Sequence, residues 1–113
     1  MRIEELINPP QWLLEADTEG ADVMLINDEV FWFDGIWKGG KWFGGVWLGG
    51  TFKGGSWFSG EFRNGVWENG VFWGGTWFEG EWKGGTWHRG LRFTFNSPDA
   101  EQTEGTSKTE DEQ

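Results

Sequence analysis

The sequence has no cysteine and no tyrosine, a single histidine and only three prolines. Without cysteine the chain can form no disulfide and no thiolate metal site. The shortage of histidine, cysteine and tyrosine removes most of the usual catalytic bases and nucleophiles. The carboxylates are spread over turns and tails, and none are paired for acid/base work. We therefore expect a protein that is not an enzyme and has no cofactor and no metal.

Long apolar runs are also missing. No stretch approaches the roughly 20 apolar residues that a membrane-spanning helix needs. The N-terminus, Met1-Arg2-Ile3-Glu4-Glu5, is acidic and lacks the apolar segment of a secretory signal. We therefore expect no membrane association and a cytoplasmic location.

What the chain has instead is 11 Trp, 10 Phe and 20 Gly among 113 residues. From residue 31 to 90 every fifth residue is glycine, and an aromatic residue stands three positions before each of these glycines. We describe this array as pentads, with residue 31 as the first position of the first pentad and the aromatic residue at the second position. The twelve second-position residues, which we predict to form the core, are Trp32, Trp37, Trp42, Trp47, Phe52, Trp57, Phe62, Trp67, Phe72, Trp77, Trp82 and Trp87.

A period of five fits neither an α-helix nor an uninterrupted strand, but it fits a three-residue strand followed by a two-residue turn. Repeated glycine also disfavours helix. The sequence therefore predicts an all-β repeat protein. Two architectures remain open. A β-solenoid buries the aromatic row inside its coils, whereas an open antiparallel meander leaves that row exposed on one face unless something covers it.

The pentads resemble the motif of the pentapeptide-repeat proteins, in which a small residue stands two positions before a central Leu or Phe. The triplets that carry this resemblance are Gly60-Glu61-Phe62, Gly80-Glu81-Trp82 and Gly85-Thr86-Trp87. The resemblance implies a right-handed, four-sided β-helix, which here would have three coils of about 20 residues each. Residues 60–65 are similar, more weakly, to a MORN repeat, which implies the meander instead.

The chain divides into a capping segment at 1–30, the repeat domain at 31–95 and an acidic tail at 96–113. In the capping segment we expect short helical turns at 2–7 and 11–15, with Trp12 and Leu13 docking onto the first coil. A strand at 23–26, a turn at Asn27-Asp28 and a terminal strand at 91–95 should complete the fold. The tail is almost free of apolar residues, which predicts disorder and favours a role in solubility over binding of a basic partner.

The net charge of −10 is unevenly distributed. Residues 1–30 hold eight acids and one base, residues 31–95 five acids and seven bases, and residues 96–113 six acids and one base. The overall charge disfavours nucleic acid as a partner. Some pentapeptide-repeat proteins inhibit DNA gyrase with an acidic, rod-like surface, but the slightly basic repeat domain here does not match that implied function.

In a solenoid the third residue of each pentad points outward, and in six pentads it is apolar: Phe33, Phe43, Leu48, Phe58, Trp73 and Phe78. With four sides, Phe33 and Trp73 would share one face, and Phe58 and Phe78 the adjacent face. A contiguous apolar patch on a protein surface indicates an interface. We therefore predict Phe33, Phe58, Trp73 and Phe78 as interface residues, unless the N-terminal segment folds back over them. His88 is expected to be a solvated side chain.

These features favour a non-catalytic structural or protein-interaction module, with a scaffold or assembly role and a protein partner or a second copy as its ligand. Two alternatives remain at this point. A carbohydrate-binding module would use exposed Trp as a stacking platform. A gyrase-type inhibitor is what the resemblance to pentapeptide-repeat proteins implies.

Overall fold

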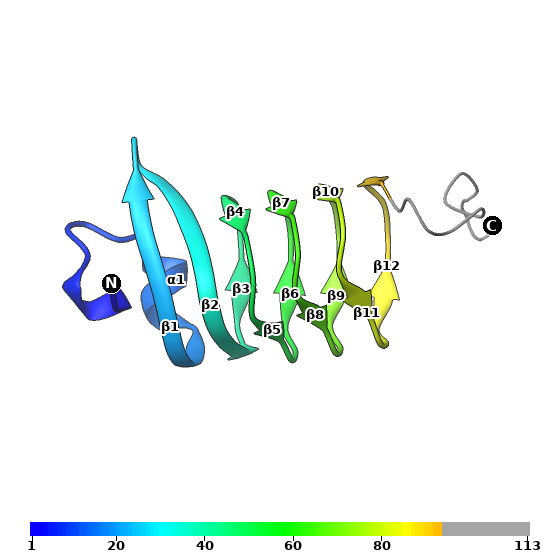
Figure 1. The fold of residues 1–113 in the computed structure, drawn as a ribbon, viewed down its shortest axis with the longest axis horizontal. Helices are drawn as coiled ribbons and strands as arrows, with labels where there is room; N and C mark the ends of the chain where they lie inside the picture. The colour runs from blue at the N-terminus through cyan, green and yellow to red at the C-terminus, as the bar shows by residue number, and fades with distance from the viewer. Residues whose placement is uncertain (94–113) are drawn as a thin grey trace.

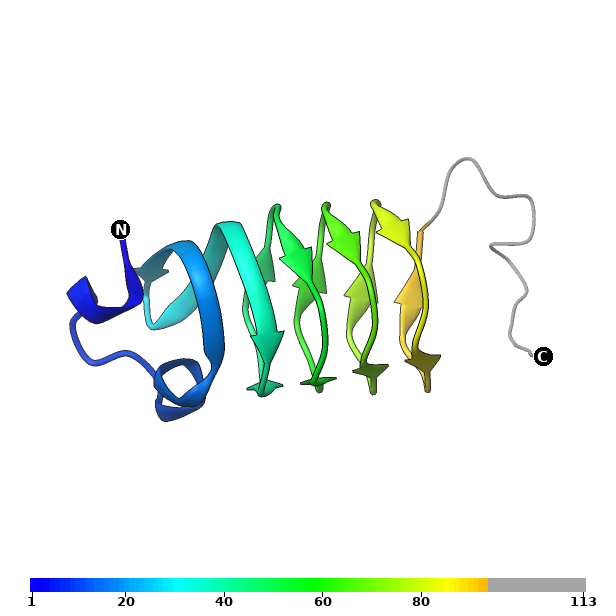
Figure 2. The same cartoon turned by 90° about the horizontal axis from the view of Figure 1, so that it is seen from below.

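The computed structural model describes residues 1–93, and within them the chain is a parallel β-solenoid of about four turns with a small N-terminal helical and strand region (Figures 1 and 2). The solenoid prediction is confirmed, and the antiparallel meander is wrong, because the repeat strands pair in parallel. The predicted acidic tail and the last two residues of the predicted terminal strand lie outside the described residues.

The N-terminal region contains a short 3₁₀ helix η1 (Ile3–Glu5), helix α1 (Gln11–Glu15) and two long strands, β1 (Asp17–Ile26) and β2 (Glu29–Gly39). All later strands are two residues long. They are β3 (Lys41–Trp42), β4 (Val46–Trp47), β5 (Thr51–Phe52), β6 (Ser56–Trp57), β7 (Glu61–Phe62), β8 (Val66–Trp67), β9 (Val71–Phe72), β10 (Thr76–Trp77), β11 (Glu81–Trp82), β12 (Thr86–Trp87) and β13 (Leu91–Arg92).

Each strand pairs with the strand three pentads further along the chain. Trp32 lies beside Trp47, and Trp47 beside Phe62, so one coil takes 15 residues. The predicted four-sided coil of 20 residues is therefore wrong. The coil has three sides, and the array makes about four turns instead of three. The period of five in the sequence is compatible with either number of sides, which is why it could not decide between them.

The three sides are named here by their strands. Face A contains the first half of β2 with β4, β7, β10 and β13. Face B contains the second half of β2 with β5, β8 and β11. Face C contains β3, β6, β9 and β12. Because β2 runs along both of the first two sides, it joins faces A and B into one hydrogen-bonded sheet, and face C is a separate sheet.

Ring packing explains why three sides suit this sequence. In the first coil the rings of Trp32, Trp37 and Trp42 meet edge to face, with centroids 5.7–6.4 Å apart and interplanar angles of 70–79°. Each ring therefore touches both others, and the three fill the interior. Along the axis, rings stack in parallel, as Trp42 does on Trp57 at 4.8 Å. With four rings per coil, the two rings that lie diagonally opposite each other would not touch. A central space would then open, which close packing disfavours.

Glycine at the fifth position forms the corner of every pentad, and its φ is positive throughout the array. At Gly70, where φ is +121°, an added Cβ would lie 2.7 Å from the Gly55 carbonyl oxygen and 3.1 Å from the Phe52 ring. The corner glycines thus stack in columns with backbone against backbone. A side chain at this position would both strain the backbone and separate two coils.

The N-terminal region closes one end of the solenoid (Figure 1). Strand β1 pairs antiparallel with β2, and the turn between them has positive φ at Asn27 and Asp28, as predicted. The predicted helical turn at 11–15 is confirmed as α1, where Leu13 is fully buried. The turn predicted at 2–7 is shorter, and the strand predicted at 23–26 is longer. No helix within residues 1–93 is long and apolar enough to cross a membrane.

We predict that Gly70→Ala lowers the free energy of unfolding by about 3 kcal/mol or more, because backbone strain and overpacking add. Gly39→Ala is the matched control: Gly39 has no atom within 4 Å of an added Cβ, and its φ is not positive. This control should change stability by less than about 1 kcal/mol. Urea titration of the full chain measures the free energy of unfolding of both variants. Equal effects of the two substitutions would contradict the inference that Gly70 forms a tightly packed corner.

Candidate functional site

The 15-residue coil places the third-position side chains of face C in one continuous exposed row. Its rungs are Phe43, Phe58, Trp73 and His88, which we call the outer ladder. Phe43 stacks on Phe58 at 4.9 Å, Phe58 on Trp73 at 6.2 Å, and Trp73 on His88 at 4.1 Å. Phe43 is 47% exposed and Trp73 39% exposed, whereas Phe58 between them is half-buried. The outer ladder is thus an aromatic strip on the surface, separate from the aromatic core.

The rings of the outer ladder lie nearly parallel, with interplanar angles of 5–17°. Each ring therefore covers the face of the next one. At the N-terminal end Trp12 contacts Phe43 in an edge-to-face arrangement, with ring centroids 6.3 Å apart. The overlap is smallest between Phe58 and Trp73, whose centroids are 6.2 Å apart, and largest between Trp73 and His88, at 4.1 Å.

The predicted interface residues do not form the single patch that four sides implied. Phe58 and Trp73 are neighbours on face C, but Phe33 and Phe78 lie on face A, with Leu48 and Arg63 between them. On face A the Arg63 guanidinium sits 5.0 Å above the Phe78 ring, and Phe78 stacks on Phe93. Grouping Phe33 with Trp73 was therefore wrong. Whether any of the four residues forms an interface stays a prediction.

The N-terminal segment does not cover the apolar surface. Trp12 packs against Trp42 at 5.2 Å and Trp37 at 6.3 Å, which plugs the end of the aromatic core. Phe33, Phe43 and Trp73 all remain at least 38% exposed. The alternative in which residues 1–30 fold back over the predicted patch is therefore wrong, since the segment covers the end of the solenoid and reaches the outer surface of face C only at Phe43, through Trp12.

The second-position row is core. From Trp32 to Phe72 each of its residues is fully buried, and Trp77 is 2% exposed. Trp82 and Trp87, in the last complete coil, are partly buried. The reading in which this row is an exposed platform is therefore wrong, and the aromatic side chains available to a ligand are those of the third position.

Charge differs between the three faces. In its pentads face C contains Lys41 and Arg89 and no acidic residue. Face B has a row of charges at its third positions, which begins with Lys38. The Lys38 ammonium contacts Glu19 of β1 at 3.0 Å. Through this hydrogen bond Lys38 lowers the pKa of the Glu19 carboxyl below its usual 4.5, and Glu19 raises the pKa of Lys38 above 10.5. Face B is thus a polar side tied to the cap.

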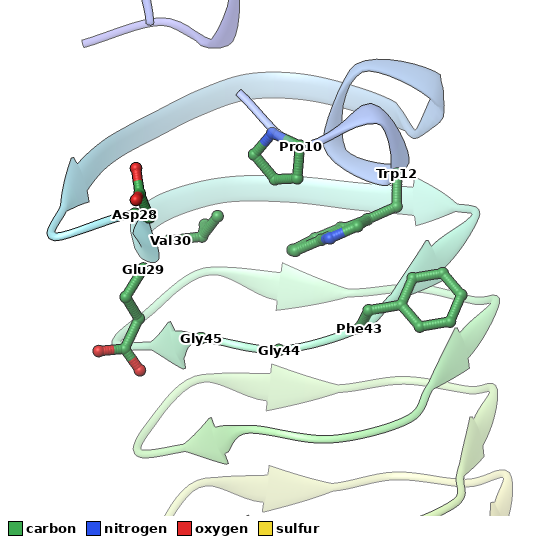
Figure 3. A pocket seen from close by; sticks show the side chains of 8 residues that line it. All are labelled: Pro10, Trp12, Asp28, Glu29, Val30, Phe43, Gly44 and Gly45. Atoms are coloured by element: carbon green, nitrogen blue, oxygen red, sulfur yellow. The ribbon is translucent and has the colours of Figure 1, made fainter. Parts of the chain in front are cut away.

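Each end of the outer ladder opens into a shallow hollow. The hollow at the N-terminal end has a volume of about 390 Å³. Figure 3 shows the carboxylates of Asp28 and Glu29 at one end of it and the rings of Trp12 and Phe43 at the other. The hollow at the C-terminal end has a volume of about 450 Å³ and includes His88 and Arg89. The two hollows therefore differ in charge: the first has two carboxylates across from Phe43, and the second has Arg89 beside His88.

The described residues offer little for catalysis. His88 is exposed and stacks on Trp73, and the exposed carboxylates of Asp28 and Glu29 lie in the turn between β1 and β2 and at the start of β2, respectively. Among residues 1–93 no three His, Asp or Glu side chains come together in a way that could hold a metal ion. Face C thus offers exposed aromatic surface along the outer ladder and the basic side chains of Lys41 and Arg89.

Sequence reasoning missed two rungs of the outer ladder. Phe43 was recognised as apolar and outward but was not grouped with Phe58. His88 is exposed, as predicted, but its stacking on Trp73 was not predicted. The signal that would have found them is the recurrence of aromatic rings at 43, 58, 73 and 88, a spacing of 15.

Comparison of the chain with protein-family models, curated proteins and solved structures gives no match.

We predict that the outer ladder contributes little to stability. Trp73→Thr should lower the free energy of unfolding by less than about 1 kcal/mol, because the side chain is on the surface. Trp57→Thr removes a fully buried ring from β6, the strand that pairs with β9 directly before Trp73, and should cost about 4 kcal/mol. Denaturant unfolding of both variants measures the difference. A similar loss in both would mean that Trp73 is a structural residue.

Proposed function

We propose that this chain is a non-catalytic protein-interaction module whose binding surface is the outer ladder of face C. The observation that carries the proposal is a row of solvent-exposed aromatic rings on a face that has no acidic residue in its pentads. Aromatic residues are enriched at the centres of protein interfaces, and a contiguous exposed apolar strip on a rigid scaffold is typical of a contact surface. A solenoid core of stacked rings supplies that rigid scaffold.

The ring orientation favours a protein partner over a sugar or a nucleic acid. Stacking on a sugar or a nucleobase requires an open ring face. In the outer ladder each ring face is turned toward a neighbouring rung, which leaves less of that face open for stacking on a ligand. Apolar side chains of a partner can pack against the ladder without a fully open ring face. Carbohydrate binding therefore remains the weaker alternative.

A gyrase-type inhibitor is also less well supported. That function was implied only by the resemblance to pentapeptide-repeat proteins, and the resemblance implied a four-sided coil. The three-sided coil of this chain departs from that four-sided structure. An acidic, DNA-like surface is not found on the sides of the solenoid either, because the repeat domain carries more bases than acids. Fold analogy alone is a weak argument for function in any case.

Photo-crosslinking from defined faces tests the proposal. A photoreactive phenylalanine, benzoylphenylalanine, replaces Phe58 in the middle of the outer ladder, and the full chain is irradiated in the cells that produce it. We expect a covalent adduct with a protein, detected as a mass increase and identified by mass spectrometry. The partner can be another protein or a second copy of the chain.

The matched control carries the same replacement at Phe78, an equally half-buried third-position residue on face A. This position should give no protein adduct, or much less. Absence of protein adducts at position 58, or equal yields at 58 and 78, would contradict binding through face C.

A further inference from the structure

The N-terminal hollow has a volume of about 390 Å³, which is within the range of small ligand sites. Two aromatic rings line one side of it: Trp12 belongs to α1, and Phe43 follows β3 directly. Asp28 and Glu29 line the opposite side, and the backbone of Gly44 lies between the two groups (Figure 3). A molecule in this hollow therefore meets aromatic rings at one end and carboxylates at the other.

The two carboxylates are not neutralised by neighbouring side chains. Within the described part of the chain, neither Asp28 nor Glu29 forms an ion pair or a side-chain hydrogen bond. Other acids of the N-terminal region do have cationic partners. Asp22 contacts the N-terminal ammonium at 2.8 Å, and Glu19 contacts Lys38 at 3.0 Å. The N-terminal hollow thus contains two negative charges that are available to a cationic ligand.

The two rings suit the carbon part of such a cation. Phe43 is 47% exposed, and its ring meets that of Trp12 at an interplanar angle of 65°. Figure 3 shows the indole of Trp12 extending from the ring side of the hollow toward Val30. Aromatic rings attract ammonium and guanidinium groups, and the alkyl stems of lysine and arginine pack on apolar surface. Rings and carboxylates therefore favour the same class of ligand.

We propose that the N-terminal hollow binds a lysine or arginine side chain of the protein partner. Its charged group lies at Asp28 and Glu29, and its alkyl stem packs against Trp12 and Phe43. The inference rests on the proposed function and gives the chemistry of the partner, because Phe43 belongs both to this hollow and to the outer ladder. Carboxylates only accept hydrogen bonds and these cations only donate them, whereas a sugar hydroxyl, which does both, matches a set of acceptors less well.

An NMR titration of the full chain tests the site. The probe is N-acetyl-lysine methylamide, and the indole N–H signal of Trp12 reports its binding. We expect a saturable shift with a dissociation constant in the millimolar range, because a single side chain buries little surface. The norleucine analogue has the same stem without the charge and should bind at least about tenfold more weakly. Methyl glucoside should bind no better than the norleucine analogue. Equal binding of the lysine and norleucine probes would overturn the proposal.

A charge-removing variant tests the two carboxylates. Asp28→Asn with Glu29→Gln keeps the shape of the hollow and should weaken binding of the lysine probe about tenfold or more. The matched control is Asp34→Asn with Glu79→Gln, which removes the same charge from two exposed residues outside the hollow. This control should bind the probe as the original chain does. Equal losses in the two double variants would mean that only the overall charge attracts the probe, and this result would contradict a specific site.

A blocking variant tests the position of the site. An added Cβ at Gly44 would have no atom within 4 Å, and the φ of Gly44 is not positive, so a side chain is tolerated there. Gly44→Leu should therefore fill the hollow and abolish the shift. Gly39→Leu is the control: Gly39 has the same pentad position on face B, equally free space around it and no part in the hollow. Normal probe binding in Gly44→Leu would place the cation elsewhere.

The photoreactive residue at position 58 distinguishes a partner's side chain from a free amine. If the cation belongs to the partner, the yield of protein adduct should fall severalfold in the variant with Asp28→Asn and Glu29→Gln. An unchanged yield would overturn this inference and leave the proposed function intact. Absence of any protein adduct at position 58 in the original chain would contradict the proposed function, whether or not the lysine probe binds.

Discussion

The edge-to-face contact of three aromatic rings within each coil is the constraint on which the remaining structure depends. Three rings that all touch one another set a triangular cross-section, and five residues per side then give a coil of 15 residues. The coil length in turn decides which outward residues become neighbours. The outer ladder is a consequence of core packing, because it follows from stacking every fifteenth residue.

The corner glycines and the core rings depend on each other for space. At Gly65, for example, an added Cβ would lie 3.0 Å from the indole nitrogen of Trp47, so glycine provides both the positive φ and the room for the ring. This packing has a cost. Six buried indole N–H groups, from Trp32 to Trp67, have no hydrogen-bond partner within the described residues. An unpaired buried donor costs about 1–3 kcal/mol, which the large buried ring area has to offset.

Much of this architecture could be predicted from the sequence. The strict Gly and aromatic period identified the β-solenoid and its buried row, and the apolar residues of the short helical turn at 11–15 predicted the docking of Trp12 and Leu13, because each follows from local chain geometry or from burial. The number of sides could not be predicted, since a period of five allows a triangle or a square and ring contacts across the coil are not local. That error separated Phe58 from Phe43 and grouped Trp73 with Phe33. The residues that become neighbours on the surface of a solenoid can be predicted only when the length of its coil is known.

The coil length itself can be measured with paired cysteines, because the chain has none of its own. In a 15-residue coil, positions 53 and 68 lie on adjacent coils of face B, at the Cα separation that a disulfide requires. Lys53→Cys with Glu68→Cys should therefore oxidise rapidly to an intramolecular disulfide. Lys53→Cys with Trp73→Cys, which a 20-residue coil would bring together, should not. Rapid crosslinking of the second pair and not the first would contradict the three-sided coil and the outer ladder that depends on it.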